Sequence, residues 1–143
     1  MRYLTRVALI VILIAAVVGG VCIYQGVSAS VHAEYVLHAA LLTIELLDEY
    51  VGVHDGQWPR SWADLEQLPP RESMFQWPAD SGEVQKYVTV DFAADPKQLA
   101  GQMPAEFDAV RPIGPYYPFK DRGQVTAFLK TIRAHKPAKE RPQ

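Results

Sequence analysis

The sequence predicts an α+β membrane protein. An N-terminal transmembrane helix continues into an amphipathic helix, and a small domain with a short β-sheet and short helices follows. Three observations predict this class. No charged side chain occurs from Val7 to Ile23, apolar residues recur at helical spacing after that stretch, and residues 86–92 alternate as a strand does.

The charge-free stretch is long enough to cross a bilayer. Its seventeen residues span about 26 Å as a helix, close to the roughly 30 Å hydrocarbon core. Arg2 and Arg6 precede the stretch and the next basic residue is Arg60, so the positive-inside rule exports everything after it. We therefore expect the inner (cytoplasmic) membrane as the location. The parts are a cytoplasmic N-terminus over residues 1–6, a transmembrane helix over 7–24 and an exported, periplasmic domain over 25–135.

A cleaved secretory signal is the alternative interpretation of the same segment. Val27-Ser28-Ala29 and Val31-His32-Ala33 both fit a small-x-Ala cleavage pattern. Two features favour retention: the apolar run exceeds the usual signal core of about 7–15 residues, and only Gly26 interrupts the helical continuation. Cleavage would release a soluble protein that begins near Ser30 or Glu34.

Composition limits the remaining function classes. The net charge of -2 argues against nucleic-acid binding. The single cysteine, Cys22, lies inside the apolar segment, so no intramolecular disulfide can form and packing must stabilise the domain. Residues 136–143 form a basic tail that we expect to be disordered.

The first element after the membrane segment is an amphipathic helix over residues 30–51. Leu37, Leu41, Ile44 and Leu47 recur at steps of three and four and so form one apolar face. Gly52 and Gly56 supply the stop signals. This helix can be continuous with the transmembrane helix.

Shorter elements follow. Ser61 predicts the N-cap of a helix over residues 62–68. Residues 86–92 read as a strand, and Asp95-Pro96 opens a short helix that ends near Ala100. Met103-Pro104 predicts a similar helix over residues 105–110, and the proline-rich stretch 111–118 is expected to be extended and turning.

A last helix is predicted after a cap at residues 121–124. Its apolar positions are Val125, Phe128, Leu129 and Ile132, the i, i+3, i+4, i+7 set.

Groups of residues at a spacing that could bind a metal or act in catalysis are few along the chain. Glu34 and His38 lie four residues apart on one helix face, which favours an ion pair over a two-ligand metal site. Four aspartates offer oxygen ligands for calcium, but their spacing matches no known loop: Asp91, Asp95, Asp108 and Asp121. The sequence therefore predicts no catalytic residue, cofactor or metal site.

Aromatic residues gather in the proline-rich segments. Trp58, Trp62, Tyr116 and Tyr117 can form a platform for a peptide or glycan, or they can fill the core of a small domain. Together with the apolar face at Leu37, Leu41, Ile44 and Leu47, they are our candidate interaction residues.

The turn after the long helix resembles a known motif. The run 56–61 reads Gly-Gln-Trp-Pro-Arg-Ser and Leu65 follows it. This is similar to type II secretion pseudopilins and type IV pilins, which often carry Gly-x-Tyr/Trp-Pro and then a leucine after a long helix. The resemblance implies a helix-plus-small-sheet domain that assembles through its N-terminal helices. The family's cleavage site, Gly before Phe-Thr-Leu-x-Glu, is absent, because residues 3–7 read Tyr-Leu-Thr-Arg-Val.

Two functional hypotheses follow from these patterns. The first is a structural or protein-interaction module, held in the lipid bilayer by residues 7–24 and associating with a protein partner or with itself through the N-terminal helices. The alternative is a small exported enzyme or ligand-binding domain, which would use the turn from His54 to Trp62 with Tyr116 and Tyr117. This alternative requires the two segments to share one pocket.

Overall fold

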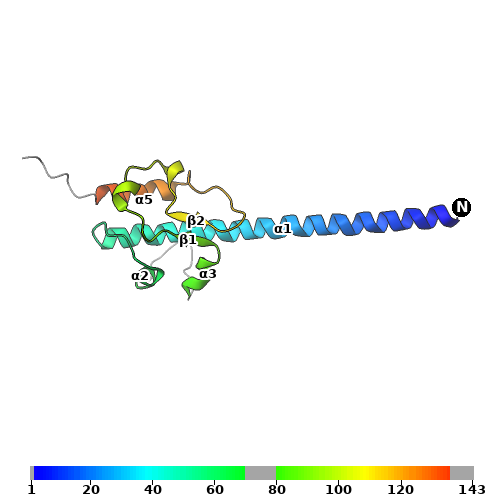
Figure 1. Cartoon of the computed structure of the whole chain (residues 1–143), viewed down its shortest axis with the longest axis horizontal. Helices are drawn as coiled ribbons and strands as arrows, with labels where there is room; N and C mark the ends of the chain where they lie inside the picture. The colour runs from blue at the N-terminus through cyan, green and yellow to red at the C-terminus, as the bar shows by residue number, and fades with distance from the viewer. Residues whose placement is uncertain (1, 70–79, 136–143) are drawn as a thin grey trace, which may run out of the picture.

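The long N-terminal helix is the axis of the molecule. The computed structural model describes residues 2–69 and 80–135, and side chains from Leu9 onward. Helix α1 (Arg2–Val53) runs without interruption, so the predicted transmembrane and amphipathic helices form one continuous rod, with Gly26 inside it. In Figure 1 the remaining elements pack around the C-terminal part of α1, and its N-terminal part (blue) projects beyond them.

The C-terminal part of α1 is buried on most of its circumference. Val36, Ala40, Ile44, Leu47 and Val51 have no exposed surface. These side chains spread over a wide face of the helix, so more than one element must cover them. Helix α5 (Gly123–Ala134) covers one side, and the small sheet covers another.

The sheet has two antiparallel strands, β1 (Val88–Val90) and β2 (Val110–Pro112), with Thr89 opposite Arg111. Strand β1 is shorter than the predicted 86–92. At one end Tyr87 N–H donates to the Val84 carbonyl and closes the preceding helix, and at the other the Asp91 side chain accepts from Ala93 N–H in a turn.

The helix predicted over residues 105–110 was wrong. Only a 3₁₀ turn, η1 (Pro104–Glu106), forms there, and β2 begins at Val110. The buried side chains of Phe107 and Ala109 alternate with the exposed Asp108, which is the pattern of an extended chain. The Ala109 carbonyl accepts from Asp91 N–H and extends the pairing with β1.

Three short α-helices complete the domain, α2 (Trp62–Glu66), α3 (Ser81–Gln85) and α4 (Pro96–Leu99). Asp95 caps α4 as predicted, accepting a hydrogen bond from Lys97 N–H at 2.9 Å. Ser61 occupies the N-cap position of α2 but its side chain makes no cap bond. Helix α3 was not predicted; Asp80 caps it by accepting from Gly82 N–H.

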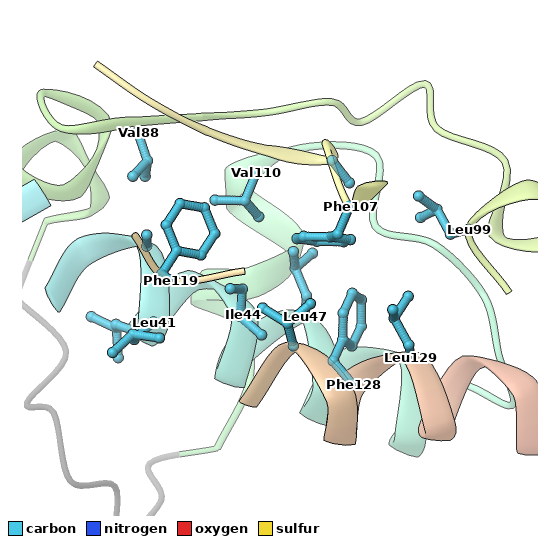
Figure 2. Close-up of a cluster of buried hydrophobic side chains, with 14 of the residues drawn as sticks. Leu41, Ile44, Leu47, Val88, Leu99, Phe107, Val110, Phe119, Phe128 and Leu129 are labelled. Carbon is cyan, nitrogen blue, oxygen red and sulfur yellow. The ribbon is translucent and has the colours of Figure 1, made fainter. Parts of the chain in front are cut away.

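Helix α5 confirms its predicted apolar face, since Val125, Phe128, Leu129 and Ile132 are all buried. Figure 2 shows Phe128 and Leu129 pointing toward Ile44 and Leu47 of α1, with Phe107 above them. The expected side-chain cap is not made, because the N-cap residue is Arg122 and it forms no cap bond. The predicted disorder of the tail at 136–143 lies outside the described residues.

Candidate functional site

The N-terminal part of α1 presents a continuous apolar surface. Every described side chain from Leu9 to Val31 is exposed, including Leu13 at 66% and Tyr24 at 75%. Within the described residues, α1 is the one helix long and apolar enough to cross a membrane; its most apolar window has a mean hydropathy of 2.4 and no buried residue. A surface of this kind is stable in contact with lipid or another apolar surface.

Four of the predicted interaction residues lie inside the domain. Leu37, Leu41, Ile44 and Leu47 are buried, and Figure 2 shows the last three within the cluster that joins α1 to Phe119 and α5. Their face was read correctly as apolar. The rest of the domain of this same chain covers that face, so these side chains form part of the hydrophobic core.

The turn after α1 has a specific backbone geometry. Asp55 and Gly56 both have positive φ, +52° and +83°. A Cβ on Gly56 would stand 2.7 Å from the His135 Cβ, so this glycine permits close packing of the turn against the end of α5. His54, the first residue after α1, places its Nδ1 2.9 Å from the Tyr50 carbonyl oxygen in the last turn of that helix.

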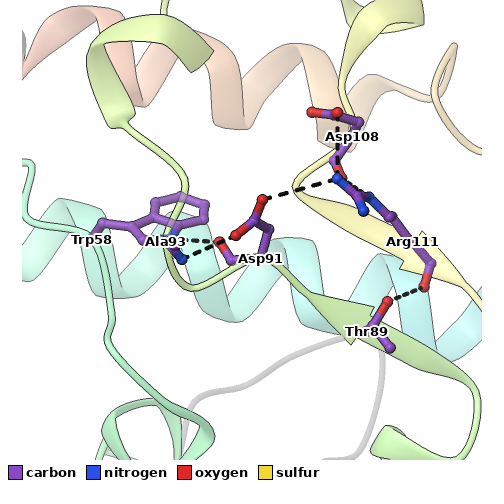
Figure 3. Close-up of polar contacts among 6 residues, drawn as sticks. All are labelled: Trp58, Thr89, Asp91, Ala93, Asp108 and Arg111. Carbon is purple, nitrogen blue, oxygen red and sulfur yellow. Dashed lines mark hydrogen bonds and ion pairs between the residues drawn. The ribbon is translucent and has the colours of Figure 1, made fainter.

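The two described tryptophans lie at the edge of the core. The Trp58 indole N–H donates to the Asp91 carbonyl at 3.0 Å (Figure 3), and its ring tilts against Phe128 at 6.1 Å. Trp62 packs edge-on against Phe92 at 5.8 Å. Both side chains are half-buried and pack against the hydrophobic core. Their contacts fit the core-filling interpretation.

Three of the four aspartates considered as calcium ligands serve other contacts. Arg111 Nη2 lies 3.9 Å from an Asp91 carboxylate oxygen and 3.7 Å from one of Asp108, and its Nε donates to the Asp108 carbonyl (Figure 3). Asp95 caps α4. Within residues 2–69 and 80–135, no three or more His, Cys, Asp or Glu side chains form a group that could hold a metal.

An open groove runs beside α1 where it enters the domain. Its volume is ≈ 480 Å³. Glu34, His38 and Leu41 line one wall, and Tyr117 and Arg122 line the other. Glu34 and His38 are in contact as predicted, with a Nε2–Oε1 distance of 3.1 Å, and they form an ion pair when the imidazole is protonated. Both side chains are about half exposed, so the pair contributes little to stability.

The His54–Trp62 turn and the Tyr116–Tyr117 segment lie at opposite ends of the domain. Gly56 contacts His135 at the end of α5, whereas Gly114 lies against His32 of α1. His32 and His54 are separated by about 33 Å along a helix of about 1.5 Å per residue. Among the described residues, the groove beside α1 is lined by Tyr117 and by no residue of the His54–Trp62 turn.

The contacts at the edge of the domain nearest the exposed apolar part of α1 were not predicted from the sequence. Tyr35 stacks on Tyr87 with ring centroids 5.8 Å apart, and His32 Nε2 lies 3.3 Å from the Ile113 carbonyl oxygen. Because these residues come from three distant segments, no local spacing brings them together. Locally, the proline-rich stretch 111–118 predicted a turn, and Gly114, at φ +83°, forms a bend within it.

Comparison with known proteins adds no assignment: no protein-family model, curated protein or solved structure matches the chain.

Proposed function

We propose that this chain is a single-pass membrane protein whose exported domain acts as a structural or protein-interaction module, similar in plan to a pseudopilin. One observation carries the proposal. A single unbroken helix, α1, has one exposed apolar part and one part that forms the centre of the domain. Because the helix is continuous, the depth at which its apolar part sits in a membrane sets the distance between the domain and that membrane.

The charge distribution gives the proposed orientation. Arg2 and Arg6 precede the apolar segment and no further Lys or Arg occurs before Arg60, so the N-terminus stays in the cytoplasm and the domain is exported, into a periplasm in a bacterium with two membranes. Protease added to intact spheroplasts should digest the domain and leave a fragment containing residues 1–24.

The anchor is tested by the intact mass of the mature protein in membrane and soluble fractions. The proposal expects the full-length chain in the membrane fraction. A soluble product that begins near Ser30 or Glu34 would instead identify the segment as a signal peptide. The domain would then begin inside α1. A start near Ser30 lies before Ala33, where the buried part of α1 begins, and a start near Glu34 lies just after it.

Self-association through the N-terminal helices is the finer part of the proposal. It is supported by the continuous helix and by the Gly-Gln-Trp-Pro turn directly after it, the arrangement that the pseudopilin resemblance implies. The chain carries its own probe, because Cys22 is its single cysteine and is exposed on α1. Oxidation in native membranes should give a disulfide-linked dimer if helices pack in parallel through that face.

The matched control moves the thiol to the opposite face of α1, with Leu13→Cys in a Cys22→Ser background. Positions 13 and 22 differ by nine residues, close to half a turn out of phase on a helix of 3.6 residues per turn. Cross-linking from Cys22 alone would support one specific interface. Equal cross-linking from both positions would indicate random collision, and none from either would contradict self-association.

A further inference from the structure

The edge of the domain nearest the apolar half of α1 is a collar of aromatic and aliphatic side chains. It comprises Tyr35 of α1, Tyr87 next to β1, and Ile113, Tyr116 and Tyr117 after β2. Figure 1 shows the segment after β2 (yellow to orange) reaching along α1 toward its N-terminal half.

Contacts with α1 hold this collar in place. The Tyr35 and Tyr87 rings stack, with an interplanar angle of 21°, and Tyr87 also lies 5.6 Å from the His32 ring. In the segment after β2, the Ile113 carbonyl oxygen lies 3.3 Å from His32 Nε2. Tyr117 lines the groove beside Glu34 and His38. The collar therefore has a fixed height on α1, at the level of residues 32–38.

Four of the five collar side chains are exposed although they are apolar or aromatic, and the fifth, Tyr87, is half-buried. Tyr35, Ile113, Tyr116 and Tyr117 retain between 39% and 56% of their surface. Tyrosine is enriched where membrane meets water, because its ring favours the apolar side and its hydroxyl favours hydrogen bonding at the headgroups.

The length of α1 places the collar at that boundary. No Asp, Glu, Lys or Arg occurs between Arg6 and Glu34, and this uncharged run spans about 40 Å of helix at about 1.5 Å per residue. A bilayer with its headgroup regions is about 40–45 Å thick. When this run fills the bilayer from one headgroup surface to the other, the unbroken α1 places Glu34 and the collar at the outer limit of the headgroups.

We propose that the collar rests on the phospholipid headgroups of the leaflet facing the domain, with its tyrosine hydroxyls hydrogen-bonded to phosphate and glycerol oxygens. The inference rests on the proposed transmembrane span. The contact fixes the orientation of the domain on the membrane and leaves the far end, at the Gly56 turn, facing away from the bilayer.

A fluorescence experiment on the full-length chain tests the collar. In a Cys22→Ala background, an environment-sensitive fluorophore is attached through Pro115→Cys, which lies between Ile113 and Tyr116 without replacing either. The chain is reconstituted into phosphatidylcholine vesicles that contain a headgroup nitroxide quencher. We expect strong quenching at position 115 and little at Ala134→Cys, an exposed position at the far end of α5.

An insertion variant supplies the decisive comparison. Seven polar, helix-forming residues placed after Ser28 raise the collar by about 10 Å and turn it by only about 20°. We expect the quenching at position 115 to fall to the level at 134. The inference is overturned by equal quenching at 115 and 134 in the parent chain, or by quenching at 115 that the insertion leaves unchanged.

A third label separates this inference from the proposed anchor. Ile12→Cys lies within the apolar segment and should be quenched by a nitroxide placed in the acyl chains. Quenching at 12 without quenching at 115 refutes the collar contact alone. No quenching at 12 refutes the membrane span itself.

Discussion

Both halves of α1 carry large aliphatic side chains, but the surroundings of those side chains are opposite. Leu13 is 66% exposed in the N-terminal half, whereas Leu47 in the C-terminal half is fully buried. Burying a large aliphatic side chain stabilises a folded state by about 1.5–3 kcal/mol. The C-terminal half gains this free energy from its own domain, and the N-terminal half can gain it only from something outside the chain.

The comparison separates two reasons for an apolar helix. In the C-terminal half, Glu34, Glu45 and Glu49 mark a polar strip opposite the side covered by the sheet and α5. No such charged strip exists from Leu9 to Tyr24, so every face of that segment is suited to hydrocarbon.

A leucine-to-alanine substitution in each half of α1 should give the largest difference in the free energy of unfolding. Leu47→Ala removes a fully buried side chain beside α5 and should lower the free energy of unfolding of the domain by about 2–5 kcal/mol. Leu13→Ala should leave it unchanged. Urea titration of the full chain in detergent micelles, followed by tryptophan fluorescence, measures both. Equal losses would show that the N-terminal half is also part of the folded core.

A charge placed in the N-terminal half should have the converse effect. Ile14→Asp, near the middle of the apolar segment, should oppose insertion by about 2.5–3.5 kcal/mol. The measurement is the fraction that resists carbonate extraction from membranes. Domain stability in the same urea titration is the control and should not change. A variant that remains fully membrane-bound would contradict a span centred on this segment.

The sequence predicts those features of the two halves that depend on interactions between residues close together in the chain. The uncharged segment and the apolar faces of α1 and α5 were predictable because a helix repeats its environment every 3.6 residues. The cap of α4 was predictable because Asp95 and Pro96 act on adjacent backbone groups.

The errors lie where distant segments meet. Residues 105–110 carry helix-start chemistry at Met103 and Pro104, but pairing with β1 pulls Ala109 and Val110 into an extended chain. The same limit applies to the candidate site. The sequence marked Leu37 and Leu41 as an interaction face because periodicity reveals an apolar face without revealing what covers it.

A pair of glycines compares the two regions at the level of the backbone. Gly56→Ala places a Cβ against His135 at a residue with φ +83°, and should destabilise the domain by about 1–2 kcal/mol. Gly26→Ala, in the exposed half of α1, meets no atom within 4 Å, and should favour the helix by about 0.5–1 kcal/mol. Urea titration reports the first and helix content by circular dichroism the second. A neutral Gly56→Ala would show that the turn can move away from α5.

Two tyrosines should locate the boundary between the halves. Tyr35 is 56% exposed but stacks on Tyr87, and an aromatic pair of this kind contributes about 0.5–1.5 kcal/mol. Tyr35→Ala should therefore destabilise the domain by about that amount, the smallest destabilisation among these variants. Tyr24 is 75% exposed, so Tyr24→Ala should not alter the unfolding midpoint. If both tyrosines mattered equally, the folded unit would extend toward the membrane; if neither did, it would begin after Tyr35, at Val36. If only Tyr35→Ala destabilises the domain, as we predict, the first contacts of the folded unit lie at His32 and Tyr35. Tyr35 stacks on Tyr87, and His32 Nε2 lies near the Ile113 carbonyl oxygen.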